Sequence, residues 1–97
     1  MIVELSVVPI GVGESLSSYV ARVLEIIKKH NLKYELNPMG TVIELENFKQ
    51  LAELLEDMDK TLFDVGSPRN YYVIKIDHRG KGGKMEDKVR SVLEKTK

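Results

Sequence analysis

Few side chains in this sequence could perform covalent chemistry. The chain has no cysteine, which excludes thiolate nucleophiles, disulfides and zinc–thiolate sites. His78 follows Asp77 in a strand-like stretch, but adjacent strand residues point to opposite faces and make poor partners for each other. His30 falls in the charged end of an expected helix. Because no spacing of His and carboxylate residues converges on a metal, we expect no enzyme, no catalytic residue, no metal and no cofactor.

Two carboxylates lie in the segment that is expected to form a hairpin. Glu35 and Glu44 could face each other across it, as the two acids of an acid–base site would. Lys33 and Lys75 are expected nearby. We therefore interpret these side chains as a balanced lattice of charges on a sheet rather than as a catalytic pair.

Two glycine-containing loops resemble phosphate-binding loops only superficially. "GVGES" precedes a helix, whose first free amides could hold an anion. "RGKGGK" places Arg79, Lys81 and Lys84 ahead of the last helix. Neither loop matches the spacing of a P-loop. Both are interpreted as turns with solvated charges.

Size and charge narrow the class of protein. The 97 residues suit one domain, 1–97. The formal net charge of zero, from fifteen basic and fifteen acidic residues, disfavours a nucleic-acid partner. The first residues, "MIVELSVVPIG", lack the basic start of a signal peptide, and no apolar run could span a bilayer. We expect a soluble cytoplasmic protein without a membrane partner.

The order of elements follows from periodicity and from punctuating residues. Apolar alternation predicts strands over 2–10, 33–37, 41–46 and the stretch "YYVIKIDHR". Helical spacing predicts one helix from a cap at Ser15 to a stop at Asn31, and another from Asn47 to near Gly66, along an apolar stripe of Phe48, Leu51, Leu55, Met58 and Leu62. A last amphipathic helix carries Met85, Val89, Val92 and Leu93.

The resulting pattern, βαββαβ plus a helix, predicts an α+β ferredoxin-like sandwich with an additional C-terminal helix. Alternation assigns each strand residue to one of two faces. The face expected beneath the helices holds Val3, Leu5, Val7, Tyr34, Leu36, Ile43, Leu45, Tyr72, Ile74 and Ile76. The open face holds Glu4, Ser6, Val8, Lys33, Glu35, Asn37, Val42, Glu44, Tyr71, Val73, Lys75 and Asp77.

The open face mixes apolar side chains with charges of both signs. Such a surface suits a symmetric interface, in which each cation can meet an anion of the partner. We therefore expect the chain to assemble with itself as a homotetramer, with a dimer as second choice.

Four stretches carry a resemblance that covers nearly the whole chain. The first holds Ser15, Ser17, Tyr19 and Val20; the second holds Tyr34, Leu36, Pro38, Met39, Gly40, Thr41 and then Glu44; the third holds Arg69, Lys75, Ile76, Asp77 and Arg79; the fourth is "KMEDKVRSV". In this order and spacing the chain resembles the small YkoF-like, thiamine-binding family. One departure is Leu45, where that family often has glycine.

The resemblance implies a ferredoxin-like fold, assembly through the sheets into dimers and tetramers, and non-catalytic binding of thiamine or its hydroxymethylpyrimidine part. The chain would then act as a carrier or sensor. The alternative is a structural or regulatory homo-oligomeric subunit without a ligand of its own.

Thiamine joins a cationic thiazolium to an aminopyrimidine, so its site needs a carboxylate, an aromatic or thioether surface, and neutral donors and acceptors. The candidate ligand-binding residues are Ser17, Tyr19, Asn37, Met39, Gly40, Thr41, Glu44, Lys75 and Asp77. Glu44 or Asp77 would supply the charge, and Lys75 would neutralise a partly buried carboxylate. We further predict that the polar side of "KYELNPMGTVIEL" faces a cavity or a subunit interface rather than bulk water.

Overall fold

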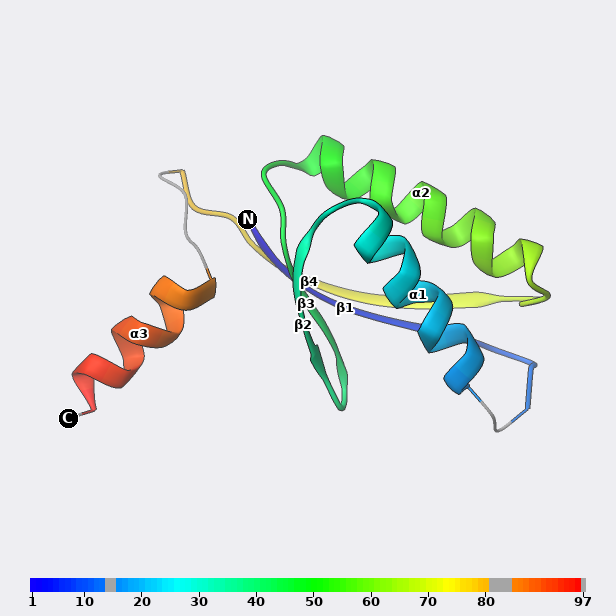
Figure 1. Cartoon of the computed structure of the whole chain (residues 1–97), viewed down its shortest axis with the longest axis horizontal. Coiled ribbons are helices and arrows are strands. Elements are labelled where there is room, and N and C mark those ends of the chain that lie inside the picture. Colours follow the sequence, from blue (N-terminus) through cyan, green and yellow to red (C-terminus); the bar gives the residue numbers. More distant parts are fainter. Residues whose placement is uncertain (14–15, 81–84, 97) are drawn as a thin grey trace.

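The computed structural model describes residues 1–13, 16–80 and 85–96, and it confirms the α+β fold (Figure 1). Its elements are β1 (Ile2–Pro9), α1 (Ser17–Lys29), β2 (Lys33–Asn37), β3 (Gly40–Glu44), α2 (Phe48–Asp64), β4 (Asn70–Asp77) and α3 (Met85–Lys95). The order matches the sequence prediction, with strand ends shifted by one or two residues. Ser15, the expected cap of the first helix, and the basic loop at 81–84 lie outside the described residues.

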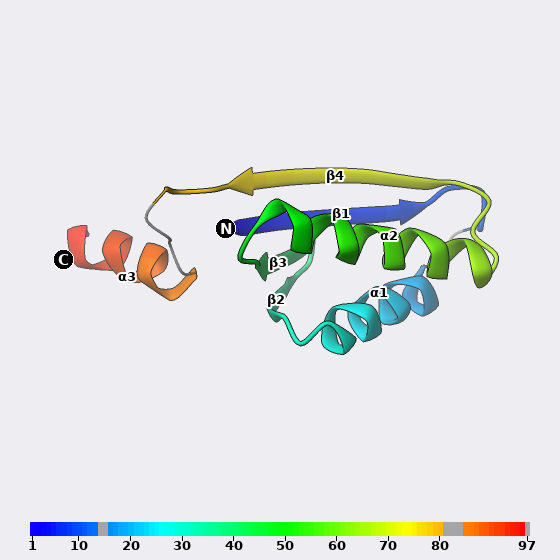
Figure 2. The same cartoon turned by 90° about the horizontal axis from the view of Figure 1, so that it is seen from above.

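The four strands form one antiparallel sheet in the order β2-β3-β1-β4, which is the ferredoxin-like topology. The register places Val3 between Ile43 and Ile76, and Leu5 between Thr41 and Ile74. Both long helices cover the face that carries these residues (Figure 2). The two faces therefore divide as side-chain alternation predicts.

The core lies between that face and the two helices. Its fully buried side chains include Val3 and Ile43 from the sheet, Ile27 from α1, and Leu54 and Met58 from α2. Each such side chain contributes about 1.5–3 kcal/mol by leaving water. The central strand β1 and the facing sides of the helices thus hold the fold together.

The helix ends use the residues that the sequence indicates. Asn47 caps α2 by accepting a hydrogen bond at 2.9 Å from the Gln50 backbone N–H, and the Gln50 side chain accepts one at 2.7 Å from the N–H of Glu46. Asn31, just past α1, has φ of 59°, and Gly66, past α2, has φ of 108°. Both adopt the left-handed conformation that ends helices, which confirms the two predicted stops.

Three expected core residues are exposed. Phe48, at the first turn of α2, lies outside the core and contacts the ring of His78 edge-on. Leu36 and Ile76 have the predicted parity, but they lie near strand ends, where they remain half exposed. Alternation fixes the face of a residue but not how far the helices reach along that face.

Glu35 and Glu44, which could have faced each other across the hairpin, are not directly opposite, and the contact of Glu44 with a lysine fits the interpretation as a charge lattice. The hairpin register places Glu44 opposite Lys33, and Glu35 opposite Val42. Glu44 instead forms an ion pair with Lys33, at 4.0 Å. The reason is the turn: Asn37 pairs with Gly40 across a two-residue loop, and this shifts each carboxylate away from the other.

The last helix lies apart from α1 and α2, beyond one end of the sheet (Figures 1 and 2). Its apolar stripe remains open, since Val89, Val92 and Leu93 are each 59–60% exposed. Lys88 on this helix forms an ion pair with Asp77 at the end of β4. The helix is thus amphipathic, as predicted, but its apolar side is not part of the core.

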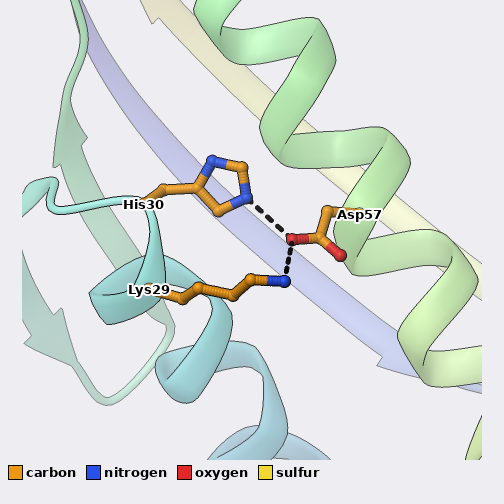
Figure 3. Close-up of polar contacts among 3 residues, drawn as sticks. All are labelled: Lys29, His30 and Asp57. Atoms are coloured by element: carbon orange, nitrogen blue, oxygen red, sulfur yellow. Dashed lines mark hydrogen bonds and ion pairs between the residues drawn. The ribbon is translucent and has the colours of Figure 1, made fainter.

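A polar cluster joins the end of α1 to the middle of α2 (Figure 3). His30 Nε2 lies 2.8 Å from Asp57 Oδ2, and Lys29 Nζ lies 3.4 Å from the same oxygen. The hydrogen bond from His30 holds the pKa of Asp57 below its usual 3.8, and Lys29 adds to this effect, while partial burial opposes it. The charged carboxylate is therefore the form that the folded state favours.

We predict that Asp57→Asn lowers the free energy of unfolding by about 0.5–1 kcal/mol at pH 7, the scale of a partly exposed ion pair. Because the folded-state pKa of Asp57 is depressed, its contribution is complete above about pH 5 and disappears as the pH falls through that pKa. Urea unfolding at pH 7, 5 and 3 measures this. The control is Asp64→Asn, at an exposed position on the same helix. An equal loss in both variants, or one that is unchanged at pH 3, would contradict the assignment.

Candidate functional site

The β2–β3 hairpin turns through Pro38 and Met39 alone, with Asn37 opposite Gly40. Proline fixes a negative φ, and Met39 is not among the described residues with positive φ. The turn is therefore not of the primed type that two-residue hairpins usually adopt. Gly40 lies against the central strand: a Cβ there would come within 3.0 Å of the Leu5 carbonyl oxygen. Only glycine fits without a shift of one strand.

A pocket of about 190 Å³ opens between this hairpin and the N-terminal half of α1. Its lining comprises residues 5–8 of β1, residues 36–41 of the hairpin, and Leu16, Val20 and Val23 at the start of α1. We call it the hairpin pocket. Because helix α1 forms one wall, the pocket lies on the helix-covered side of the sheet and not on the polar side of the hairpin.

The hairpin pocket is lined by a hydroxyl that makes no hydrogen bond within the described part of the chain. Thr41 is only 6% exposed, and its side chain makes no hydrogen bond with any described residue. Among the described residues that are buried or partly buried, every fully enclosed polar side-chain atom has a hydrogen-bond partner. The hydroxyl must therefore reach open space, and the hairpin pocket is the space it lines. Asn37, half buried, also borders the pocket, but its side chain has the parity of the open face, opposite to that of Thr41.

The rest of the lining is neutral and mostly apolar. None of the described residues in the wall carries a charge. Val20, Leu36 and Met39 form an exposed apolar rim, with Met39 88% exposed. Ligand sites usually measure about 300–1,000 Å³. A pocket of this size and polarity suits one flat neutral ring that can exchange hydrogen bonds with the Thr41 hydroxyl.

The structure thus brings together four of the nine residues predicted to bind a ligand: Asn37, Met39, Gly40 and Thr41. Two others, Ser17 and Tyr19, lie on α1 outside the lining. The Tyr19 hydroxyl lies near Gly66, just past the end of α2, and it would be 3.9 Å from a Cβ atom if Gly66 carried one. Tyr19 packs against the core and points away from the hairpin pocket.

The remaining three, Glu44, Lys75 and Asp77, lie on the open face of the sheet. Each has a partner within the chain: Lys33 for Glu44, Glu4 at 3.7 Å for Lys75, and Lys88 for Asp77. The partly buried Glu44 side chain meets a lysine, as the sequence argument requires, but the lysine is Lys33 rather than Lys75. In one chain these charges form a lattice separate from the hairpin pocket.

Sequence reasoning missed the contribution of α1 to the site and a second polar cluster. Leu16, Val20 and Val23 recur at helical spacing with the buried Ile27, so nothing in the sequence distinguished them from core residues. Asp59 on α2 accepts hydrogen bonds from Tyr72, at 2.7 Å, and from the Asn70 amide, at 2.9 Å. Burial raises the pKa of Tyr72, and its hydrogen bond to Asp59 raises it further, so the phenol remains a donor.

Three further observations bear on what the chain can bind. Among the side chains that the structure describes, no three of His, Cys, Asp or Glu gather as metal ligands would. None of the helices within residues 1–13, 16–80 and 85–96 combines the length and apolar character needed to cross a bilayer. A larger pocket of about 480 Å³ lies between β2 and α3, lined in part by Tyr34, Met85 and Leu93.

Comparison with known proteins assigns the chain to a family. The model of the thiamine-binding protein family matches residues 3–93. The chain belongs to this family. A UPF0045 protein of Methanothermobacter thermautotrophicus is 43% identical over 94 residues, with 95% of each chain covered. The UPF0045 protein YqgV of Bacillus subtilis is 34% identical over 94% of this chain and 92% of its own. The resemblance drawn from the four sequence stretches is thereby confirmed.

Solved structures of similar proteins support the same fold. The hypothetical protein MJ1052 of Methanocaldococcus jannaschii superposes with a TM-score of 0.84 at 32% identity, covering 96% of this chain and 95% of that one. A Thermotoga maritima protein, provisionally described as a thiamine biosynthesis/salvage protein, gives a TM-score of 0.82 at 26% identity, covering 94% and 96%. The family is described by thiamine binding and not by a reaction.

We predict that Gly40→Ala lowers the free energy of unfolding by about 1–3 kcal/mol, the usual range for forcing an extra carbon into a packed region. The added Cβ would press on the Leu5 carbonyl, which belongs to the backbone and cannot turn aside. Gly80→Ala is the matched control, because nothing lies within 4 Å of a Cβ there. Urea unfolding of both variants tests this. Equal stability of the two would show that the hairpin yields to the methyl group without cost.

Proposed function

We propose that this chain is a non-catalytic carrier or sensor that binds thiamine or its hydroxymethylpyrimidine part, with the ring of the ligand in the hairpin pocket. The observation that carries the proposal is the Thr41 hydroxyl, which has no hydrogen-bond partner among the described residues and reaches the open space of a neutral pocket, although the residue as a whole is only 6% exposed. A ligand that covers this hydroxyl without bonding to it would bury a polar group without a partner, at a cost of about 1–3 kcal/mol. The pocket therefore favours a ligand that forms a hydrogen bond with Thr41. Family membership supplies the class of ligand.

The size and charge of the hairpin pocket select the aminopyrimidine part of thiamine. The space of about 190 Å³ takes one ring rather than two joined rings. The described lining has no carboxylate to meet a thiazolium cation. A neutral aminopyrimidine can donate and accept hydrogen bonds at the Thr41 hydroxyl while its flat faces contact Val20 and Met39. The thiazolium, and any phosphate attached to it, would then remain outside the pocket.

We predict that Thr41→Val weakens the binding of hydroxymethylpyrimidine and thiamine by about 1 kcal/mol, the net value of one hydrogen bond. The free energy of unfolding should stay the same or rise slightly, because the change removes a hydroxyl that has no partner among the described residues. Isothermal titration calorimetry with thiamine, its phosphates and hydroxymethylpyrimidine measures the first effect, and urea unfolding measures the second.

Glu44→Gln is the matched control for Thr41→Val, since it is also close to isosteric. If the ring binds in the hairpin pocket, Glu44→Gln leaves affinity unchanged within about twofold, because Glu44 is paired with Lys33 on the open face. The sequence argument that Glu44 itself binds the cation demands the opposite, a loss of about 1–3 kcal/mol with Glu44→Gln. Weakened binding in the Glu44 variant alone would move the site to the open face.

A second role, as a self-assembling structural or regulatory subunit, is favoured by the open face of the sheet. Val8, Tyr71 and Val73 are 36%, 54% and 46% exposed there. The ion pairs of Glu44 with Lys33 and of Lys75 with Glu4 lie on the same face. Apolar side chains among charges of both signs suit a two-fold interface. We propose that this face joins copies of the chain into a homotetramer, or a dimer as second choice.

We predict that light scattering at micromolar concentration gives the mass of about four chains of 11.0 kDa each. Val73→Asp should lower this mass, because it places an unpaired carboxylate in the apolar part of the interface. Phe63→Asp is the control, at an exposed apolar position on α2 away from the sheet. A wild-type mass of one chain refutes assembly. Equal effects of both substitutions would place the interface elsewhere.

A further inference from the structure

The hairpin pocket has an oxidisable rim. Met39 is 88% exposed, at the tip of a two-residue turn, and it is part of the pocket lining. Methionine normally belongs to the more buried residue types. The turn itself does not require a methionine, because its geometry is set by Pro38 and by the close approach of Gly40 to Leu5. The position therefore has a side chain that the fold does not use.

The other three methionines are better shielded. Met58 is 0% exposed in the core and Met1 is 6% exposed. Met85, on α3, is of intermediate exposure and lines the pocket between β2 and α3. Because oxidation of methionine depends on access to sulfur, the exposures rank Met39 first, Met85 second, and Met1 and Met58 last.

We propose that Met39 is a site of reversible oxidation by peroxide, and that its oxidation lowers the affinity of the hairpin pocket for its ligand. In this step the O–O bond of hydrogen peroxide breaks, one oxygen atom forms the S–O bond of the sulfoxide, and the other leaves as water. The sulfur loses two electrons and the peroxide gains them. Methionine sulfoxide reductases can reverse the change. The effect on affinity rests on the proposed function, whereas the order of oxidation does not.

The physical cause of the lowered affinity is the polarity of the sulfoxide. The rim of the hairpin pocket is apolar, with Val20 and Leu36 beside Met39. A thioether can lie flat on an aromatic ring with favourable contacts. A sulfoxide oxygen there would lose water when the ring binds, and the described lining offers it no charged group. Covering a polar group without a partner corresponds to an affinity loss of about tenfold.

The experiment treats the whole protein with dilute hydrogen peroxide and follows each methionine by peptide mass spectrometry. Aliquots are titrated with hydroxymethylpyrimidine by calorimetry. We expect Met39 to gain one oxygen before Met85, and Met58 and Met1 to gain theirs last. Binding should weaken about tenfold in step with the Met39 sulfoxide. Added sulfoxide reductase should restore it.

Three variants separate the causes, each compared with itself before and after peroxide. Peroxide should leave the affinity of Met39→Leu unchanged. It should lower the affinity of Met85→Leu as much as it lowers that of the wild type. Met39→Gln, which places a polar side chain of similar length at the rim, should bind weakly without peroxide and change little with it. These results would tie the loss to the sulfur at position 39.

Two results would overturn the proposal: oxidation of Met85 or Met58 ahead of Met39, or full affinity in protein whose Met39 is a sulfoxide. If untreated protein binds neither thiamine nor hydroxymethylpyrimidine, the proposed function fails and the effect on affinity fails with it. The order of oxidation is still decided by the mass spectra alone. The two proposals therefore fail in distinguishable ways.

Discussion

The packing of two helices on a single face of the sheet is the constraint from which the other features of this protein follow. β1 is central in that sheet, and Val3 and Leu5 are almost completely buried beneath the helices. Since α1 and α2 cover one side, the other side has no cover from either of them (Figure 2). Its mixture of paired charges and exposed valines is a direct result. The hairpin pocket lies on the covered side, between the β2–β3 turn and the first turns of α1.

Most of the fold could be predicted from the sequence, because its signals are local. Alternation fixed the face of each strand residue, Asn47 with Gln50 marked the start of α2, and Gly66 marked its end. Features that depend on the distance between elements could not be predicted. Whether α2 would cover Ile76, or α1 would cover Leu36, depends on where each helix lies on the sheet. The register that pairs Glu44 with Lys33 depends on the position of the turn. A turn one residue later in the chain would place Glu44 opposite Glu35.

The candidate site shows the same division. The contiguous block from Asn37 to Thr41 could be predicted, since neighbours in a hairpin turn stay together in any fold. Glu44, Lys75 and Tyr19 were grouped with it by motif, and no local rule says that motifs meet in space. A better prediction for Thr41 was available. It shares parity with Ile43 and Leu45, so alternation alone places its hydroxyl on the helix-covered side, away from the charges of the open face.

The Asp59 cluster has a consequence for how the sheet opens. Asn70 and Tyr72 bind Asp59, and Ser67 donates to the Asn70 amide oxygen at 2.5 Å, so the first half of β4 is fastened to α2. The second half, from Lys75 to Asp77, has exposed side chains and lies at the edge of the sheet. Amide protons should therefore exchange with solvent faster toward Asp77 than toward Tyr72. The strand would therefore open locally from its Asp77 end, while the Asn70 end stays bound to α2.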